Sequence, residues 1–109
     1  MSTTIETEIY LNSLSDDTLF IDISCEGIKS LPDLSRFKTL KKLECSNNQL
    51  TSLDNLPPTL TYLDCSYNNI TNLDNLTPTL TKLICYNNEL KKLVSITSVI
   101  SHYKKEFLV

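Results

Sequence analysis

Four cysteines are the residues of this chain best suited to chemistry, because thiolates bind metals, form disulfides and act as nucleophiles. They lie 20 residues apart, at Cys25, Cys45, Cys65 and Cys85. Zinc sites pair their ligands about two to four residues apart, so this spacing gives a metal site little support. Strands stacked about 4.8 Å apart would still bring three of these thiols together, which leaves a metal or a disulfide open. Core packing of reduced cysteine is the favoured interpretation.

Other catalytic groups are sparse. A nucleophilic Ser or Cys needs a neighbouring base, and the single histidine, His102, lies in the carboxy-terminal segment. Asp54 and Asp74 resemble a carboxylate pair. They occupy the same position in successive repeats, however, in the loop that leaves the core, where Asp favours turns. The only glycine, Gly27, excludes a glycine-rich phosphate loop. We therefore expect no catalytic residue, no metal and no cofactor, and we do not expect an enzyme.

These residues belong to a repeat. The spacing Leu-x-x-Leu-x-Cys-x-x-Asn-x-Leu-x-x-Leu begins at Leu40, Leu60 and Leu80. Alternation around Leu-x-Cys has a period of two, which predicts short strands with apolar side chains facing a core. One unit of this length cannot bury its apolar face alone, so we expect the strands to stack in parallel.

The repeated spacing also predicts the structural roles of the asparagines and the prolines. An amide can both donate to and accept from neighbouring turns. We expect a structural ladder formed by Asn48, Asn68 and Asn88. Pro57, Pro58 and Pro78 oppose a regular helix, so the side opposite the strands is expected to be extended or 3-10.

The first unit has a different length. Cys25 precedes Cys45 by 20 residues, but that frame would place Ser30 where the later units carry Leu50 and Ile70. A shift of two residues puts four apolar side chains into the core: Ile21, Ile23, Ile28 and Leu31. The first unit then spans residues 18–39, with Glu26 at the ladder position. Cys25 moves to the outer edge and is expected to be partly exposed.

Both ends of a stack expose core and need covers. Thr3 and Glu6 suggest a capping box, and a helix near residues 4–14 would bury Ile5, Ile9, Tyr10 and Leu14. An apolar stripe at helical spacing predicts a second helix over residues 94–109, formed by Ile96, Val99, Ile100, Tyr103 and Phe107. That stripe could instead bind a partner or a membrane surface. We expect one domain over residues 1–109, with a cap at 1–17, repeats at 18–39, 40–59, 60–79 and 80–93, and a cap at 94–109.

Together these features resemble a leucine-rich-repeat protein. The Leu-x-Cys-Ser-x-Asn-Asn strand, the LDNLPPTL return and a composition without alanine carry the resemblance over roughly residues 18 to 93. The chain is most similar to the short-repeat proteins of giant DNA viruses of amoebae, and it also resembles the repeats of bacterial effectors. The resemblance implies an α/β solenoid with a parallel sheet on its concave face. It also implies protein binding without catalytic activity.

Outward columns of the predicted sheet supply the candidate contact surface. One column runs Phe20, Lys42, Tyr62, Lys82, the next Asp22, Glu44, Asp64, Ile84, and an edge column Cys25, Asn47, Tyr67, Asn87. Aromatic residues gather in the later units, as in binding hot spots. The expected partner-binding residues are Tyr62, Asp64, Tyr67, Lys82, Ile84 and Tyr86. Tyrosine as an ordinary strand residue on a solvated face is the equal alternative.

Charge and hydropathy restrict the partners. The formal net charge is -3 over 109 residues, so we expect no nucleic acid partner. No export signal and no membrane span are apparent, which predicts a cytoplasmic protein, in the host cytoplasm if it is viral. Residues 1–22 carry five acids and no base, whereas residues 82–109 carry five lysines and two acids. Head-to-tail self-association, or assembly through the ends as a structural or virion component, is therefore one alternative to a monomer that binds an unknown protein. A substrate-recognition adaptor for a separately recruited ubiquitin ligase is another.

Overall fold

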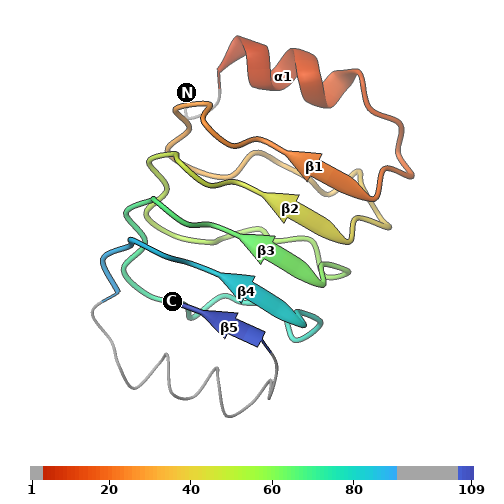
Figure 1. The fold of residues 1–109 in the computed structure, drawn as a ribbon. Helices are drawn as coiled ribbons and strands as arrows, with labels where there is room; N and C mark the ends of the chain where they lie inside the picture. The colour runs from red at the N-terminus through yellow and green to blue at the C-terminus, as the bar shows by residue number, and fades with distance from the viewer. Residues whose placement is uncertain (1–3, 91–105) are drawn as a thin grey trace.

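The computed structural model describes residues 4–90 and 106–109. These residues form one helix, α1 (Ile5–Asn12), and five strands: β1 (Phe20–Asp22), β2 (Lys42–Glu44), β3 (Tyr62–Asp64), β4 (Lys82–Ile84) and β5 (Glu106–Leu108). The strands make one sheet in the order β1-β2-β3-β4-β5, and each adjacent pair is parallel. Figure 1 shows them side by side in chain order, with α1 next to β1. The fold is α/β with a parallel sheet.

The strand register settles the frame of the first unit. Leu43 pairs with Leu63, and Leu63 with Leu83, at the 20-residue spacing. Ile21 pairs with Leu43, which is a separation of 22 residues. This is the register that the longer first unit predicts, and Cys25 accordingly lies exposed at the edge of the sheet.

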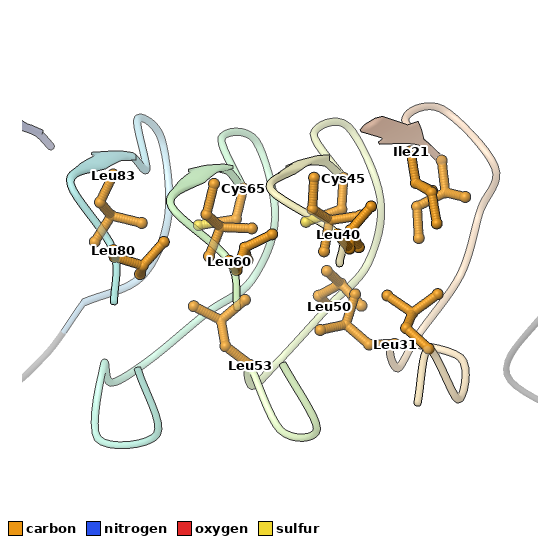
Figure 2. Packing of buried hydrophobic residues seen from close by; sticks show 14 of the residues in the cluster. Ile21, Leu31, Leu40, Cys45, Leu50, Leu53, Leu60, Cys65, Leu80 and Leu83 are labelled. Atoms are coloured by element: carbon orange, nitrogen blue, oxygen red, sulfur yellow. The ribbon is translucent and has the colours of Figure 1, made fainter. Parts of the chain in front are cut away.

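The core lies on one side of the sheet, between the strands and the return segments. Buried side chains from both point into it, as Figure 2 shows for Ile21 of β1 and Leu31 of the return segment that follows. The central strand residue is fully buried in each of the first three strands, at Ile21, Leu43 and Leu63. Because each side chain fits against its equivalents in the adjacent units, the apolar columns hold the units in register.

Asparagine amides join each unit to its neighbour. Asn68 Oδ1 accepts from the Leu50 N–H, and Asn68 Nδ2 donates to the carbonyls of Cys45 and Cys65, each at 3.0 Å. Asn48 bonds the first unit in the same way, and Asn88 accepts from the Ile70 N–H. These are the contacts of the expected ladder. They satisfy buried backbone groups where the chain leaves the sheet.

The return segments also bond between units. Thr59 Oγ1 donates to the carbonyl of Leu40, and Thr79 Oγ1 donates to that of Leu60, both at 2.7 Å. Residues 51–59 and 71–79 form turns joined by irregular backbone, without the 3-10 helix that was one expectation for this side. Proline opposes a regular helix in these segments, since it lacks an amide hydrogen and restricts the preceding residue.

Helix α1 begins at a different cap and buries a different face from those predicted. Thr3 lies outside the described residues, and Thr4 Oγ1 accepts from the Thr7 N–H. Ile5 and Ile9, expected in the core, are 70% and 64% exposed, whereas Thr7 and Leu11 are buried. The buried face of α1 is determined by contacts with residues distant in the sequence. Thr7 Oγ1 donates to Glu26 Oε1 at 2.9 Å, which the spacing of apolar residues in α1 could not indicate.

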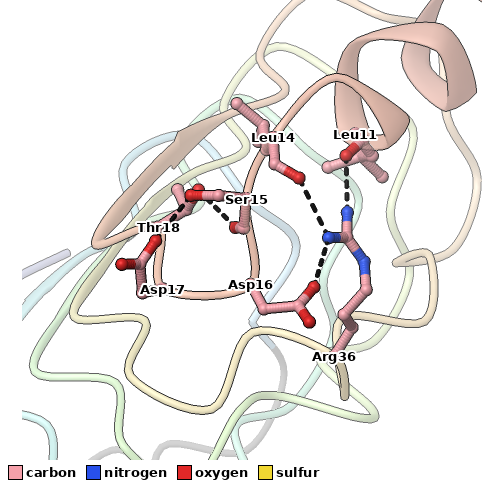
Figure 3. Close-up of polar contacts among 7 residues, drawn as sticks. All are labelled: Leu11, Leu14, Ser15, Asp16, Asp17, Thr18 and Arg36. Atoms are coloured by element: carbon pink, nitrogen blue, oxygen red, sulfur yellow. Dashed lines mark hydrogen bonds and ion pairs between the residues drawn. The ribbon is translucent and has the colours of Figure 1, made fainter.

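The single arginine holds the end of α1 against the first unit. Arg36 Nη2 donates to the carbonyl of Leu11 at 2.7 Å, and Nη1 donates to that of Leu14 at 2.9 Å. Nη1 also lies 2.6 Å from Asp16 Oδ1 (Figure 3). One guanidinium therefore bonds a carbonyl in the last turn of the helix, a carbonyl just beyond it and a carboxylate of the following turn.

The carboxy-terminal prediction is wrong for the last residues. Glu106–Leu108 forms strand β5 and not the end of a helix, while residues 94–105 of the predicted helix lie outside the described residues. The Cys85 N–H donates to the carbonyl of Leu108 at 2.7 Å, and the Glu106 N–H donates to that of Thr81 at 3.2 Å. Strand β4 would otherwise leave these edge groups unpaired, and this requirement outweighs the helical spacing of the apolar residues.

Candidate functional site

The outward face of the sheet carries the predicted contact residues on two adjacent strands. Tyr62 pairs with Lys82, and Asp64 pairs with Ile84, in the register of β3 and β4. All four side chains are partly buried. Tyr67 and Tyr86 lie beyond the ends of these strands and are 55% and 42% exposed. The six residues therefore lie on neighbouring units, and the two tyrosines past the strand ends are the most accessible.

The first outward column is a row of alternating rings and lysines. Lys42 Nζ lies 4.5 Å from the ring centroid of Tyr62 and 5.1 Å from that of Phe20. Lys82 Nζ lies 5.7 Å from the Tyr62 ring and 3.3 Å from Glu106 Oε2. Both ammonium groups are thus engaged within the chain. The spacing placed these residues in one column but did not reveal that the lysines lie over the rings.

The second outward column carries carboxylates. Asp22 Oδ1 accepts from the Ser24 N–H at 2.9 Å, and Asp64 Oδ1 accepts from the Ser66 N–H at 3.1 Å. Glu44 Oε1 lies 3.7 Å from Lys42 Nζ. Each aspartate therefore stabilises the turn after its strand. Within residues 4–90 and 106–109, no group of three or more His, Cys, Asp or Glu side chains is arranged to hold a metal ion.

The edge column has a backbone requirement that sequence reasoning missed. Its four residues have positive φ: Cys25 at 59°, Asn47 at 56°, Tyr67 at 58° and Asn87 at 54°. Asparagine suits this left-handed conformation, but a bulky residue such as tyrosine does not. The asparagines at positions 47 and 87 were the sequence features that could have indicated this left-handed conformation. Tyr67 therefore occupies a position for which the fold favours a different residue.

Hydrogen bonds of their main-chain groups place the two exposed tyrosines on adjoining segments. The Tyr67 N–H donates to the carbonyl of Tyr86 at 2.7 Å. The Tyr86 N–H donates to Ser66 Oγ at 3.0 Å. Tyr86 occupies the column in which earlier units carry Ser24 and Ser46. Aromatic side chains thus replace small or polar ones at two adjoining positions.

The interior thiols are poorly suited to nucleophilic chemistry. Burial raises the pKa of Cys45 and Cys65 well above the usual range of a thiol. Burial also raises the pKa of Cys85 to about 12, and the Asp64 carboxylate adds to the effect. Thiols held neutral do not attack electrophiles or bind metals readily. Cys25 is the exposed member of the four, and His102 lies outside the described residues.

The candidate carboxylate pair consists of turn residues. Ser52 Oγ donates to Asp54 Oδ2 at 2.9 Å, and Asn75 Nδ2 donates to Asp54 Oδ1. The Asp74 N–H donates to Asn72 Oδ1 at 3.2 Å. Both aspartates are exposed in the return segments, on the opposite side of the core from the strands. Their contacts maintain the turns, as their repeat position predicts.

Among the described residues, no helix has the length and apolar character to cross a bilayer. No family model and no curated protein matches this sequence.

Proposed function

We propose that the chain is a leucine-rich-repeat solenoid whose outward, concave face binds a protein partner. The observation that carries the proposal is Tyr67, an exposed aromatic residue in a left-handed turn, adjoining exposed Tyr86. Exposed tyrosines are enriched at the centres of protein interfaces. A residue that opposes local backbone preference indicates a requirement other than folding.

The repeat features support the solenoid. Equivalent strand residues pair at 20-residue intervals from β2 to β4, and the asparagine amides bond across units. In this proposal α1 covers the first unit, and its Thr7–Glu26 hydrogen bond continues the asparagine column. Repeat stacks need such terminal covers because each unit buries its core only against a neighbour.

An intracellular location is part of the same proposal. All four cysteines are free thiols. Reducing compartments maintain thiols in this state, and secreted domains of this size more commonly carry disulfides. A binding partner would accordingly be sought in the cytoplasm.

Photo-crosslinking tests the binding face. A benzophenone amino acid would replace Tyr62 on the outward face or, as the control, exposed Lys38 in the first return segment. We expect a discrete protein adduct in the native cell from position 62 and none from position 38. Adducts of equal yield from both positions, or an adduct from position 38 alone, would refute binding through this face.

Assembly through the β5 end is a second candidate. Among residues 4–90 and 106–109, strand β5 is the last strand in the sheet order, and unpaired strand edges add strands from other chains. At the opposite end, α1 lies beside β1, and the Asp22 N–H donates to Tyr10 Oη at 3.2 Å. Light scattering at low and high salt tests this candidate. A monomer under both conditions would refute it, whereas a dimer lost at high salt would point to contacts between charged ends.

A further inference from the structure

The two exposed tyrosines form one patch with two strand residues. We call this group the Tyr67 patch; it comprises Asp64, Tyr67, Ile84 and Tyr86. The register sets Asp64 beside Ile84, and the Tyr67 N–H bonds to the carbonyl of Tyr86. The patch therefore combines a carboxylate, an aliphatic side chain and two phenol rings from two adjacent units.

Rings and cations are combined elsewhere in the molecule. Lys42 and Lys82 both lie over the Tyr62 ring, and Arg36 lies 4.2 Å from the ring centroid of Phe37. Among the residues that the structure describes, no Lys or Arg lies over Tyr67 or Tyr86. The rings of the patch are thus available to a cation from another molecule.

The carboxylate of the patch is similarly available. Glu44 pairs with Lys42, Glu106 with Lys82 and Asp16 with Arg36. Asp64 makes no ion pair within residues 4–90 and 106–109. Asp64 Oδ1 accepts from the Ser66 N–H, so a bound cation would meet a carboxylate that is hydrogen-bonded to the turn but has no competing cationic side chain among the described residues. Ile84 can pack against the methylene groups of a long basic side chain.

We propose that the Tyr67 patch binds a protein segment through an arginine or lysine side chain. The charged group pairs with Asp64 and lies against the rings of Tyr67 and Tyr86. This inference depends on the proposed function and adds the chemistry of the partner. The left-handed backbone at Tyr67 is part of the argument, because asparagine occupies the equivalent positions 47 and 87. Tyrosine at this position provides a ring that the fold itself does not require.

Titration with short peptides tests the inference. Three capped nonapeptides of Gly and Ser would differ only in two central residues, which are Arg, Lys or Gln. Each would be added to the nitrogen-15-labelled protein at low salt. We expect the Arg and Lys peptides to shift the amide resonances of residues 64, 67, 84 and 86. Their affinity should exceed that of the Gln peptide by about threefold or more, since an exposed cation–ring contact has an effect of this size. Comparison of the Arg and Lys peptides identifies the preferred cation.

Two variants and a control assign the effect to the patch. Tyr67→Asn and Asp64→Asn should each lower the affinity for the Arg peptide by about threefold. Glu6→Gln removes one negative charge from exposed α1 and should leave it unchanged. A Gln peptide that binds equally well, shifts confined to other residues, or no saturable shift at millimolar peptide would each overturn the inference. If the position-62 adduct still forms in the native cell, only the partner chemistry is wrong; if it is also absent, the proposed function fails as well.

Discussion

Two neighbouring columns of residues at the end of the sheet differ in what the fold requires of them. The ladder column contains Asn48, Asn68 and Asn88, whose amides bond to backbone groups of the same and the preceding unit. The edge column lies one residue earlier in each unit and contains Cys25, Asn47, Tyr67 and Asn87. Its residues share one backbone conformation, with φ between 54° and 59°. The fold thus dictates the side chain in one column and only the backbone in the other.

This difference separates structural from functional requirements. An asparagine amide supplies both donor and acceptor, and no apolar residue could satisfy the groups that Asn68 bonds. The edge column tolerates several side chains because they project into solvent. Tyr67 is 55% exposed there, at the expense of local conformational preference. We expect a binding partner to contact the residues that differ between otherwise equivalent units.

Removal of a ladder amide should have the largest effect on folding. Asn68→Ala leaves the buried Leu50 N–H without its partner and removes one of the two amide donors to the Cys45 carbonyl. Each unsatisfied buried group costs about 1–3 kcal/mol, so we expect the free energy of unfolding to fall by about 3 kcal/mol. Urea denaturation measures the change. Exposed Asn69→Ala is the matched control, with an expected change below about 0.5 kcal/mol. Equal losses in the two variants would mean that the fold does not require asparagine at the ladder position.

Alkaline pH should distinguish the buried thiols from the edge thiol. Burial raises the pKa of Cys65 in the folded state, whereas unfolded thiols ionise near a pKa of about 8.5. The contribution of the neutral thiol is therefore complete below that pH and declines as the pH rises above it. Between pH 7 and pH 10, one thiol should account for a loss of about 2 kcal/mol.

Two cysteine variants isolate this effect from other titrations. Cys65→Ala should lose about 2 kcal/mol less than the parent over the same pH interval, measured by urea denaturation at each pH. Cys25→Ala removes the exposed thiol and should lose as much as the parent. The same pH dependence in both variants would contradict the assignment of the alkaline effect to buried cysteine.

Thr7 should show whether the ladder column continues into α1. Thr7→Val keeps the side-chain volume but removes the hydroxyl that donates to Glu26 Oε1. We expect a loss of about 1 kcal/mol, together with faster hydrogen exchange of the α1 amides. Thr51→Val, at an exposed position, is the control. Unchanged exchange in α1 would mean that the column ends at Asn48.

The repeat register was predictable because period and burial agreed at each position. Ile21, Leu43 and Leu63 pair as expected, since a shift of one residue would expose the apolar face. The buried face of α1 was not predictable, because Thr7 is fixed by a residue 19 positions away. Strand β5 was not predictable either, since it depends on the open edge of β4.

The candidate site was predictable only as a set of columns. Spacing placed Tyr62 and Lys82 together, but the position of each ammonium over a ring depends on side-chain conformation. The left-handed turn at Tyr67 could have been inferred from Asn47 and Asn87, because asparagine is enriched in that conformation. Tyr67 considered alone does not indicate a left-handed conformation.

The most direct test of the account is Tyr67→Asn, measured for both stability and binding. Asparagine adopts the left-handed turn more readily, so the free energy of unfolding should rise by about 0.5–1 kcal/mol. In the same variant, the protein adduct formed from a crosslinker at position 62 should be lost or strongly reduced. A gain in stability with a loss of binding would support a tyrosine retained for function. A less stable variant, or one with an undiminished adduct, would contradict that claim.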